Sequence, residues 1–218
     1  MVITVDGYDG TGKTTLAKNI AKRYGFTYLE KPVIRMIAVQ KGCDLEEAEK
    51  IVQQQEGVLW KSKDKHKIAE YYCEAYRFVR ELGKTCDIVM DRGLLTLYAI
   101  VGDDETKDAF DKYIQEGLFY EGSVYLTATD ETRIDRIRRR NPNDPDLKRP
   151  HWRDNDLQEY ADSRHLNYFT VATDERNTDE VFEEAIKFLD PLLLNRNNKV
   201  KNDSNNDLSS LDEEDTPI

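Results

Sequence analysis

Short apolar runs alternate along the chain with longer segments in which apolar residues recur every three or four positions. The short runs are rich in β-branched and aromatic residues and predict buried strands, at residues 2–6, 26–29, 86–90, 123–127 and 169–174. The longer segments predict helices, at residues 16–24, 33–40, 44–60, 68–82, 94–100, 108–117, 130–140, 155–168 and 180–194. This alternation predicts an α/β fold, a three-layer sandwich whose mostly parallel, five-stranded sheet carries helices on both faces.

The loop between the first predicted strand and the first predicted helix fits the phosphate-binding pattern G-x-x-x-x-G-K-[ST]. Glycines let such a loop curl tightly, so that backbone N–H groups and the helix N-terminus point at phosphate oxygens. The lysine reaches the β- and γ-phosphates, and the hydroxyl after it binds Mg²⁺. We therefore expect ATP and Mg²⁺ to bind at Gly7, Asp9, Gly10, Thr11, Gly12, Lys13, Thr14 and Thr15, with Thr14 as a metal ligand.

A charged pair, Asp91-Arg92, ends the strand predicted at residues 86–90. Ligands of open α/β sheets bind at the carboxyl ends of the strands, where the phosphate loop also lies. An acid at this point commonly holds Mg²⁺. We predict that Asp91 is a metal-binding and catalytic residue.

Arginine is concentrated on the helix predicted at residues 130–140 and in the proline-rich segment that follows it. A solvated cationic face is the ordinary explanation of such a helix. A lid that closes over phosphates is the alternative, because the segment follows a strand–helix unit of a nucleotide-binding fold. We expect the lid at about residues 138–156. A polar stripe containing Glu70 and Arg77 leaves a similar choice open, between an ion-pair ladder and part of an acceptor pocket.

The composition favours one folded domain, residues 1–194, followed by an acidic tail. Residues 203–218 carry −6 of the net charge of −11, so the body is only mildly acidic and no extended basic surface for duplex nucleic acid is indicated. The segment 195–218 is rich in Asn, Asp and Ser and predicts disorder, as a solvated end or a partner-binding segment. Three scattered cysteines and the lack of a long apolar run predict a soluble, intracellular, cytoplasmic protein.

Taken in order, these motifs resemble those of the thymidylate kinase-like nucleoside monophosphate kinases over roughly residues 1–190. An acid at the position of Asp9 is characteristic of that family's phosphate loop, where it approaches the acceptor's 3′-hydroxyl. Asp91-Arg92 is similar to the family's Asp-Arg motif, whose arginine clamps phosphates between donor and acceptor. Thr173-Asp174 matches the loop near the donor's adenine, which places Asp174 at the ATP site.

The resemblance also implies where the transition-state charge comes from. No arginine stands inside the phosphate loop, so lid arginines are implied to supply that charge, with Arg149 and Arg153 first and Arg136 and Arg140 behind them. The family often forms dimers, which implies a possible homodimer.

The chain departs from that family after the second strand, where Glu30-Lys31-Pro32 stands in place of Arg-Glu-Pro, and at Gly93, where the family has Tyr, His or Ser. The related deoxynucleoside kinases use a Glu near this proline to deprotonate a 5′-hydroxyl, and Glu30 is similar to that residue. Those kinases lack the phosphate loop with an acid at the Asp9 position. Glu30 is therefore the candidate catalytic base if the acceptor is a hydroxyl.

These features predict Mg²⁺-dependent transfer of the ATP γ-phosphoryl group to a deoxynucleoside monophosphate similar to dTMP, a small-molecule nucleotide acceptor. Two alternatives stay open. One is a kinase acting on a hydroxyl of a deoxynucleoside or of a modified base, including a base within DNA. The other is a nucleotide-binding regulatory module without turnover, although simple binding does not require the charge gathered in Asp91-Arg92 and the lid.

Overall fold

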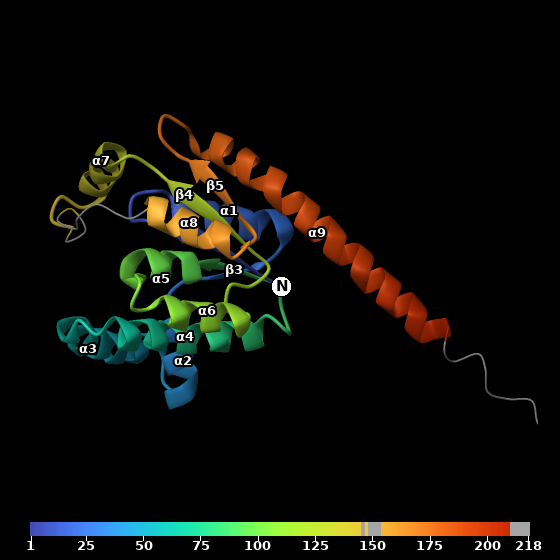
Figure 1. Cartoon of the computed structure of the whole chain (residues 1–218), viewed down its shortest axis with the longest axis horizontal. Helices are drawn as coiled ribbons and strands as arrows, with labels where there is room; N and C mark the ends of the chain where they lie inside the picture. The colour runs from blue at the N-terminus through green and yellow to red at the C-terminus, as the bar shows by residue number, and fades with distance from the viewer. Residues whose placement is uncertain (145–146, 148–153, 210–218) are drawn as a thin grey trace, which may run out of the picture.

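The computed structural model describes residues 1–144, 147 and 154–209, and its core is one five-stranded sheet (Figure 1). The strand order is β2-β3-β1-β4-β5, and all four neighbouring pairs are parallel. The strands are β1 (Val2–Gly7), β2 (Thr27–Leu29), β3 (Ile88–Asp91), β4 (Gly122–Thr127) and β5 (Tyr168–Ala172). The predicted strands are confirmed to within two residues at each end. The phosphate loop leaves the central strand β1 and lies beside the end of β3.

Two helical layers cover the sheet, as the alternating pattern predicts. On one face, Ile3 and Val5 of β1 belong to an apolar cluster with α1 (Lys13–Tyr24) and α9 (Thr178–Ser209). On the other face, Val2 belongs to a second cluster that holds the remaining covering helices. Those helices are α4 (Lys65–Leu82), α5 (Leu94–Val101), α6 (Lys107–Gln115) and α8 (Asp154–Ser163). The two clusters separate because successive side chains of a strand point to opposite faces.

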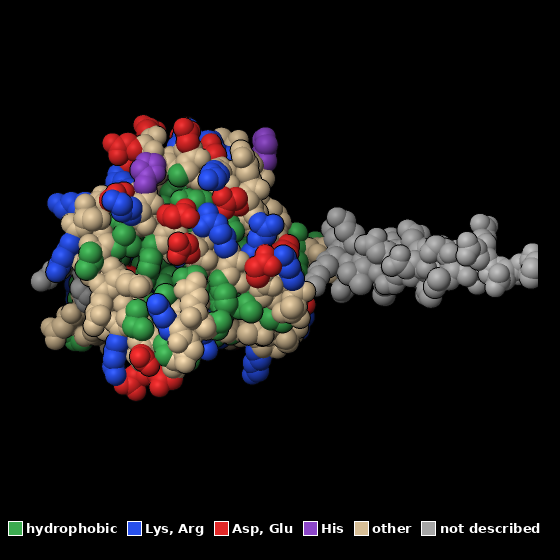
Figure 2. Space-filling model, turned by 90° about the horizontal axis from the view of Figure 1, so that it is seen from below, with side chains coloured by type: hydrophobic (Ala, Val, Ile, Leu, Met, Phe, Trp, Pro, Cys, Tyr) green, Lys and Arg blue, Asp and Glu red, His purple; other side chains and the backbone are tan. Residues whose placement is uncertain are grey.

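A third apolar cluster lies away from the sheet. It joins α2 (Pro32–Lys41) and α3 (Leu45–Ser62) to α4, through buried residues such as Met36, Val52 and Ala75. Asp44 caps α3 by accepting a hydrogen bond from the Glu47 backbone N–H at 2.8 Å, and aspartate is among the residues preferred at this position. Seen from this side, acidic and basic side chains are mixed with apolar ones, and the described residues form no continuous basic area on the face in view (Figure 2).

The predicted lid, residues 138–156, includes the end of α7 (Asp130–Arg140), the segment after it and the start of α8. Its residues 145–146 and 148–153 lie outside the described residues, and with them the candidates Arg149 and Arg153. At the other end of the chain, α9 projects beyond the body and continues as a helix through residues 195–209, where the composition predicts disorder (Figure 1). Extending a helix that already exists costs less than starting one, which offers a physical reason for the difference.

Candidate functional site

The phosphate loop needs glycine at two positions. Gly7 and Gly10 have φ angles of 131° and 86°. A Cβ at Gly7 would lie 2.4 Å from the Leu126 carbonyl oxygen, and one at Gly10 would lie 2.7 Å from the Arg133 carbonyl oxygen. Only a residue without a side chain fits both the backbone conformation and the space. The glycines of the motif therefore bring the loop against β4 and α7.

Lys13 begins α1 with its side chain inside the loop. It is 5 % exposed, its Nζ donates to the Tyr8 carbonyl oxygen at 2.6 Å, and it lies 3.9 Å from Asp9 Oδ1. Burial, followed by the positive charge of Arg92, lowers the pKa of Lys13 to about 7. A bound phosphate would offset both effects by supplying negative charge, which favours the protonated form and raises the pKa.

Asp91 and Thr14 meet across the gap between β3 and α1. Thr14 Oγ1 donates to Asp91 Oδ2 at 2.5 Å, while Asp91 Oδ1 is buried and has no hydrogen-bond partner. A buried carboxylate oxygen without a partner is costly unless a ligand satisfies it. A hydroxyl and a carboxylate are the hard oxygen donors that Mg²⁺ prefers, and Mg²⁺ is commonly held by one or two side chains together with substrate phosphates. These two residues therefore fit the expected Mg²⁺ ion.

Within the described part of the chain, no all-protein metal cage accompanies this pair. The residues that the structure describes contain no group of three or more His, Cys, Asp or Glu side chains arranged to hold a metal. The site therefore suits an ion that arrives with a phosphate ligand.

Arg92 turns back from β3 toward the phosphate loop. Its φ of 76° is unusual for a residue with a side chain, and its backbone N–H donates to the Val5 carbonyl oxygen at 3.0 Å. Its guanidinium is ion-paired with the carboxylate of Asp9. The resemblance assigns Asp9 to the acceptor side and Arg92 to the phosphates between the substrates, and the structure brings the two side chains together.

A buried carboxylate that the sequence patterns did not identify joins the two motifs. Asp6 is fully buried and accepts five hydrogen bonds of 2.6–2.8 Å, from the hydroxyls of Thr4, Ser123 and Thr96 and from the backbone N–H groups of Gly93 and Thr96. The Thr96 hydroxyl in turn accepts from the Gly7 N–H at 3.1 Å. Asp6 thus ties the base of the phosphate loop to the start of α5, immediately after Asp91-Arg92. The sequence feature that could have identified Asp6 is its position as an acid directly before Gly7, at the end of an apolar strand.

The same contact explains the departure at Gly93. A Cβ built there would lie 2.7 Å from Cγ2 of Thr4 and 2.8 Å from its Cβ. Thr4 is buried and its hydroxyl is bonded to Asp6, so it has little room to move. A larger residue after Asp91-Arg92 would separate α5 from β1.

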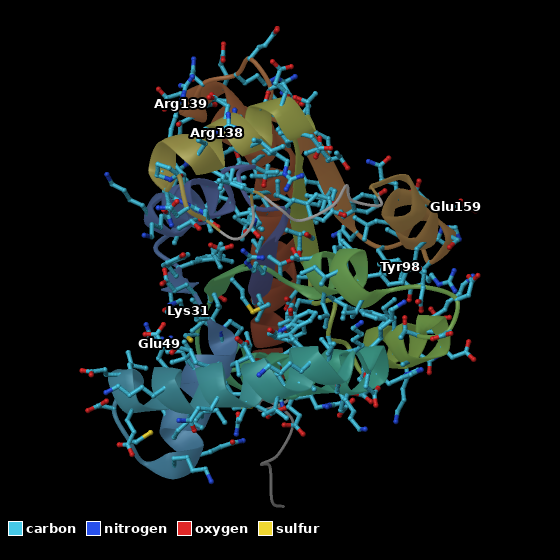
Figure 3. The ribbon with its side chains drawn as sticks, turned by 90° about the vertical axis from the view of Figure 1, so that its left-hand side faces the viewer. Lys31, Glu49, Tyr98, Arg138, Arg139 and Glu159 are labelled. Atoms are coloured by element: carbon cyan, nitrogen blue, oxygen red, sulfur yellow. The ribbon has the colours of Figure 1, made fainter. Side chains whose placement is uncertain are left out.

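The arginines of α7 divide into two groups. Arg133 is buried and its Nε donates to the Asp9 carbonyl oxygen at 2.8 Å, while Arg136 donates to the Gly10 carbonyl oxygen at 3.3 Å and to the Thr173 carbonyl oxygen at 2.7 Å. Arg138 and Arg139 are exposed at the opposite end of the view from α3 (Figure 3). One side of α7 therefore holds the phosphate loop and the other faces solvent.

Two further candidates for the ATP site differ in their surroundings. Arg140 lines the main cavity and is paired with Asp144 at 2.8 Å. Asp174 accepts hydrogen bonds from the Thr129 N–H and hydroxyl at 2.9 and 2.7 Å. Burial acts to raise the pKa of Asp174, but hydrogen bonds from Thr129 and Thr132 outweigh it and the pKa is lowered. In the described residues, the Asp174 carboxylate is thus engaged in joining the β4–α7 turn to the β5–α9 turn.

A cavity of about 1350 Å³ extends from the phosphate loop to α3 and α4. It contains Lys13, Thr14, Asp91, Arg92 and Glu30. Its far side, here called the acceptor wall, consists of Glu49, Val52, Gln53, Glu56 and Trp60 of α3 with Tyr72 and Tyr76 of α4. Lys31 and Glu49 form an ion pair of 2.6 Å beside this wall, where α2 and α3 meet (Figure 3). The volume is sufficient for two substrates, since pockets for one small ligand measure about 300–1,000 Å³.

Tyr28, which the sequence patterns did not identify, connects Glu30 to the expected metal position. The Tyr28 hydroxyl donates to Glu30 Oε2 at 3.1 Å and lies 3.4 Å from Asp91 Oδ2. Burial first, and then the charges of the two carboxylates, raise the pKa of this phenol. Tyr28 therefore stays protonated and can donate to either acid.

The polar stripe on α4 is an ion-pair ladder. Arg77 donates to Glu70 at 2.7 Å and to Glu116 at 2.9 Å, and Glu70 also accepts from the Tyr113 hydroxyl at 2.9 Å. These residues connect α4 to α6 and do not belong to the lining of the main cavity among the residues described. Ion pairing is therefore the alternative observed for this stripe, although Arg77 pairs with a residue seven positions away and with α6 rather than three or four positions along α4.

Comparisons with known proteins agree with this architecture. A family model described as an AAA domain matches residues 3–163. The cytidylate kinase of Methanopyrus kandleri is 24% identical over 204 residues, which are 88% of this chain and 95% of that protein. The cytidylate kinase of Thermococcus kodakarensis is 46% identical over 54 residues, 24% of this chain and 28% of that protein. The match to the Thermococcus protein thus spans little more than a quarter of its length.

Solved structures share the fold at low sequence identity. Deoxyadenosine kinase from M. mycoides with bound dATP has a TM-score of 0.53 and 19% identity, with 87% of this chain and 100% of that chain covered. Thymidylate kinase from Ehrlichia chaffeensis has a TM-score of 0.53 and 18% identity, with 87% and 98% covered.

Among the described residues, no helix combines the length and the apolarity that crossing a bilayer requires. The phosphate loop, the Asp91-Arg92 turn and α7 all fall within residues 3–163, the greater part of the chain. The fold is that of the P-loop kinases, and the chain belongs to the AAA domain family.

Proposed function

We propose that this protein is a Mg²⁺-dependent kinase that transfers the γ-phosphoryl group of ATP to a deoxynucleoside monophosphate. One observation carries the proposal. The Thr14–Asp91 contact leaves a buried Asp91 oxygen for a ligand, and the next residue, Arg92, reaches Asp9 in the phosphate loop. The residues for the donor phosphates and a cation aimed between two substrates thus come from adjacent turns.

Each residue has a role that its surroundings support. Phosphoryl transfer requires positioning and neutralisation of charge more than covalent chemistry. Lys13 and the N-terminus of α1 would bind the donor's phosphates, and Arg92 would neutralise charge on the transferred group. Thr14 and Asp91 would hold Mg²⁺, which when bound neutralises and orients the donor phosphates. Arg133 and Arg136 keep the loop in shape through its carbonyl oxygens.

Which nucleobase the acceptor carries is a separate question. The motif resemblance favours a dTMP-like acceptor, whereas the relative that aligns over most of its length is named a cytidylate kinase. We therefore propose the deoxynucleoside monophosphates as a class and would compare dTMP and dCMP first.

A second candidate function is favoured by Glu30. A hydroxyl acceptor needs a base, whereas a phosphate acceptor is already ionised. Glu30 faces the cavity and is linked through Tyr28 to Asp91. Apart from Lys13 and the α7 residues Arg136 and Arg140, the described cations that line the cavity are Lys31 and Arg92, and both are paired with carboxylates. These observations support phosphorylation of a deoxynucleoside hydroxyl.

A panel assay separates the candidates. Purified protein with Mg²⁺ and ATP is offered each deoxynucleoside monophosphate, each deoxynucleoside and single-stranded DNA, and ADP formation and product mass are measured. Turnover of monophosphates, lost in Lys13→Ala and little changed in Glu30→Gln, is the expected result. Turnover confined to unphosphorylated acceptors and lost in Glu30→Gln would transfer the assignment to the second candidate. Binding of ATP without turnover of any acceptor would indicate a regulatory module.

The lid arginines remain part of the proposal. A cation aimed at the transition state contributes about 10²–10³ in rate. We expect Arg149→Ala or Arg153→Ala to lower kcat by about that factor, and Arg138→Ala, at an exposed position on the outer side of α7, to leave kcat unchanged. Equal kcat values for all three variants would remove the lid from the mechanism.

A further inference from the structure

One stripe of α3 faces the acceptor end of the cavity. The cavity is lined by Glu49, the adjacent pair Val52 and Gln53, Glu56 and Trp60, which follow one another along the helix at steps of three or four residues. This spacing places them on one side of the helix. The stripe combines an amide and carboxylates with an aromatic ring, a set that can contact both the edge and the face of a planar ligand.

Glu56 is fixed in position by α4. The Tyr72 hydroxyl donates to Glu56 Oε1 at 2.8 Å. Burial, and then the charge of Glu56, raise the pKa of Tyr72, so the phenol remains a donor. The bond uses one carboxylate oxygen, and the other is left to accept a hydrogen bond from a ligand.

Two neighbouring aromatic rings accompany this carboxylate on the acceptor wall. The rings of Trp60 and Tyr72 are 6.5 Å apart between centroids, at an interplanar angle of 52°. Tyr76 lies deeper, with its hydroxyl donating to the Gly93 carbonyl oxygen at 3.2 Å. Through Gly93 the wall is connected to the Asp91-Arg92 turn. A base that stacks on these rings would therefore lie in the same cavity as the phosphate loop.

We propose that the acceptor wall reads the acceptor's base, and that Glu56 and Gln53 select a base that carries an exocyclic amino group. This inference rests on the proposed function, because it treats the cavity as an acceptor site. A carboxylate only accepts hydrogen bonds. Cytosine and adenine each offer an amino group beside a ring nitrogen that accepts, and guanine offers an amino group beside a ring N–H. Glu56 complements the amino group, and the amide of Gln53 can donate to or accept from the neighbouring ring nitrogen.

Thymine and uracil present the opposite arrangement. Their single N–H lies between two carbonyl oxygens, so a carboxylate that approaches this edge meets two groups that only accept. Glu56 is half-buried and Gln53 is exposed before the acceptor binds, so a bound base would have to cover these groups. Covering a polar group without a matching partner is what makes an enzyme discriminate strongly between similar substrates. We expect discrimination of about tenfold or more, because a tenfold ratio requires about 1.4 kcal/mol, which lies within the range of about 1–3 kcal/mol for one good pair of hydrogen bonds to a base.

The experiment uses acceptors that differ only in this group. Values of kcat/KM are measured for dCMP against dUMP and for dAMP against dIMP, together with the corresponding deoxynucleosides. The wild-type protein should prefer the amino-bearing member of at least one pair by tenfold or more. Glu56→Gln should bring that ratio near one, because an amide can also donate to a carbonyl oxygen. Tyr72→Phe should reduce the ratio by releasing Glu56.

The matched control is Glu47→Gln, which removes the same charge from an exposed position on α3 away from the cavity. Its ratio should equal that of the wild-type protein. A Glu56→Gln protein that unfolds at the wild-type temperature and keeps the wild-type ratio would overturn the inference. A wild-type ratio near one in both pairs would do so as well.

Binding separates this inference from the proposed function. The affinity of each acceptor is measured by calorimetry in the presence of ADP. If no acceptor is turned over but dCMP or dAMP binds ten times more tightly than its carbonyl analogue, the proposed kinase activity fails and the recognition of the base stands. If all bases are turned over with equal kcat/KM, the kinase stands and the recognition by Glu56 fails.

Discussion

Binding of a nucleotide to the phosphate loop should be accompanied by uptake of a proton on Lys13. In the free protein the Lys13 ammonium is buried and lies near Arg92, which lowers its pKa to about 7. A bound triphosphate brings negative charge to the same side chain and should return the pKa toward its ordinary value of 10.5. The protonated form of Lys13 therefore binds the nucleotide more tightly than the neutral form.

The magnitude follows from the two pKa values. At pH 8 about a tenth of the free protein carries the proton, so binding should take up about 0.9 proton per site, and at pH 7 about 0.5. The apparent affinity should fall as the pH rises above 7, by nearly tenfold per pH unit until the pKa of the complex is reached. Moving the pKa from about 7 to 10.5 corresponds to about 5 kcal/mol of differential interaction with the phosphates.

Calorimetry of Mg²⁺-ATP binding at pH 8 tests this directly. The observed enthalpy is measured in buffers with different ionisation enthalpies, and its slope against the buffer's enthalpy gives the number of protons taken up. The matched control is Lys13→Arg, which keeps a positive charge at every pH and should show a slope near zero. Wild-type binding whose enthalpy does not depend on the buffer would refute the assignment of a lowered pKa to Lys13.

Three further predictions concern stability and the walls of the site. Lys13 loses its proton near pH 10.5 in the unfolded chain but near pH 7 in the folded, nucleotide-free protein. The free energy of unfolding should therefore rise with pH between these two values. A Lys13→Met protein whose free energy of unfolding rises equally steeply would contradict this. Asp6→Asn should lower the free energy of unfolding by about 3 kcal/mol, because an amide N–H₂ would face hydrogen-bond donors. The control Asp104→Asn, at an exposed residue, should lower it by less than about 0.5 kcal/mol. Urea titration measures both values. Arg77→Ala should cost about 1 kcal/mol or less and leave the acceptor KM unchanged, and a raised KM would return Arg77 to the acceptor site.

The residues on the donor side of the site could be predicted from local sequence patterns. Gly7 to Thr15 could be identified because strand, loop and helix are contiguous, and Asp91-Arg92 because it ends an apolar run. The parallel sheet then places both at one edge, with β3 directly beside β1. The order of the elements was predicted for the same reason, since periods of two and of 3.6 residues are local properties of the chain.

The remaining contacts depend on distances along the chain that no local pattern contains. Asp6 and Thr96 meet only when α5 packs beside β1, 90 positions later. The sequence alone did not distinguish the arginines of α7 from one another. The orientation of that helix about its axis determines that Arg136 faces the loop while Arg138 faces solvent. For Glu56, the position of α3 depends on a cluster that contains no strand.

The hydrogen bonds of Asp6 connect the phosphate loop rigidly to the Asp91-Arg92 turn. The α3 side of the acceptor wall belongs to a different packing cluster, joined to the body through α4. Side chains on α3 can therefore be exchanged while the atoms that meet the triphosphate keep their alignment. If the proposed function holds, a combinatorial library limited to Gln53, Glu56 and Trp60 would explore new acceptors while leaving the phosphate-loop residues unchanged.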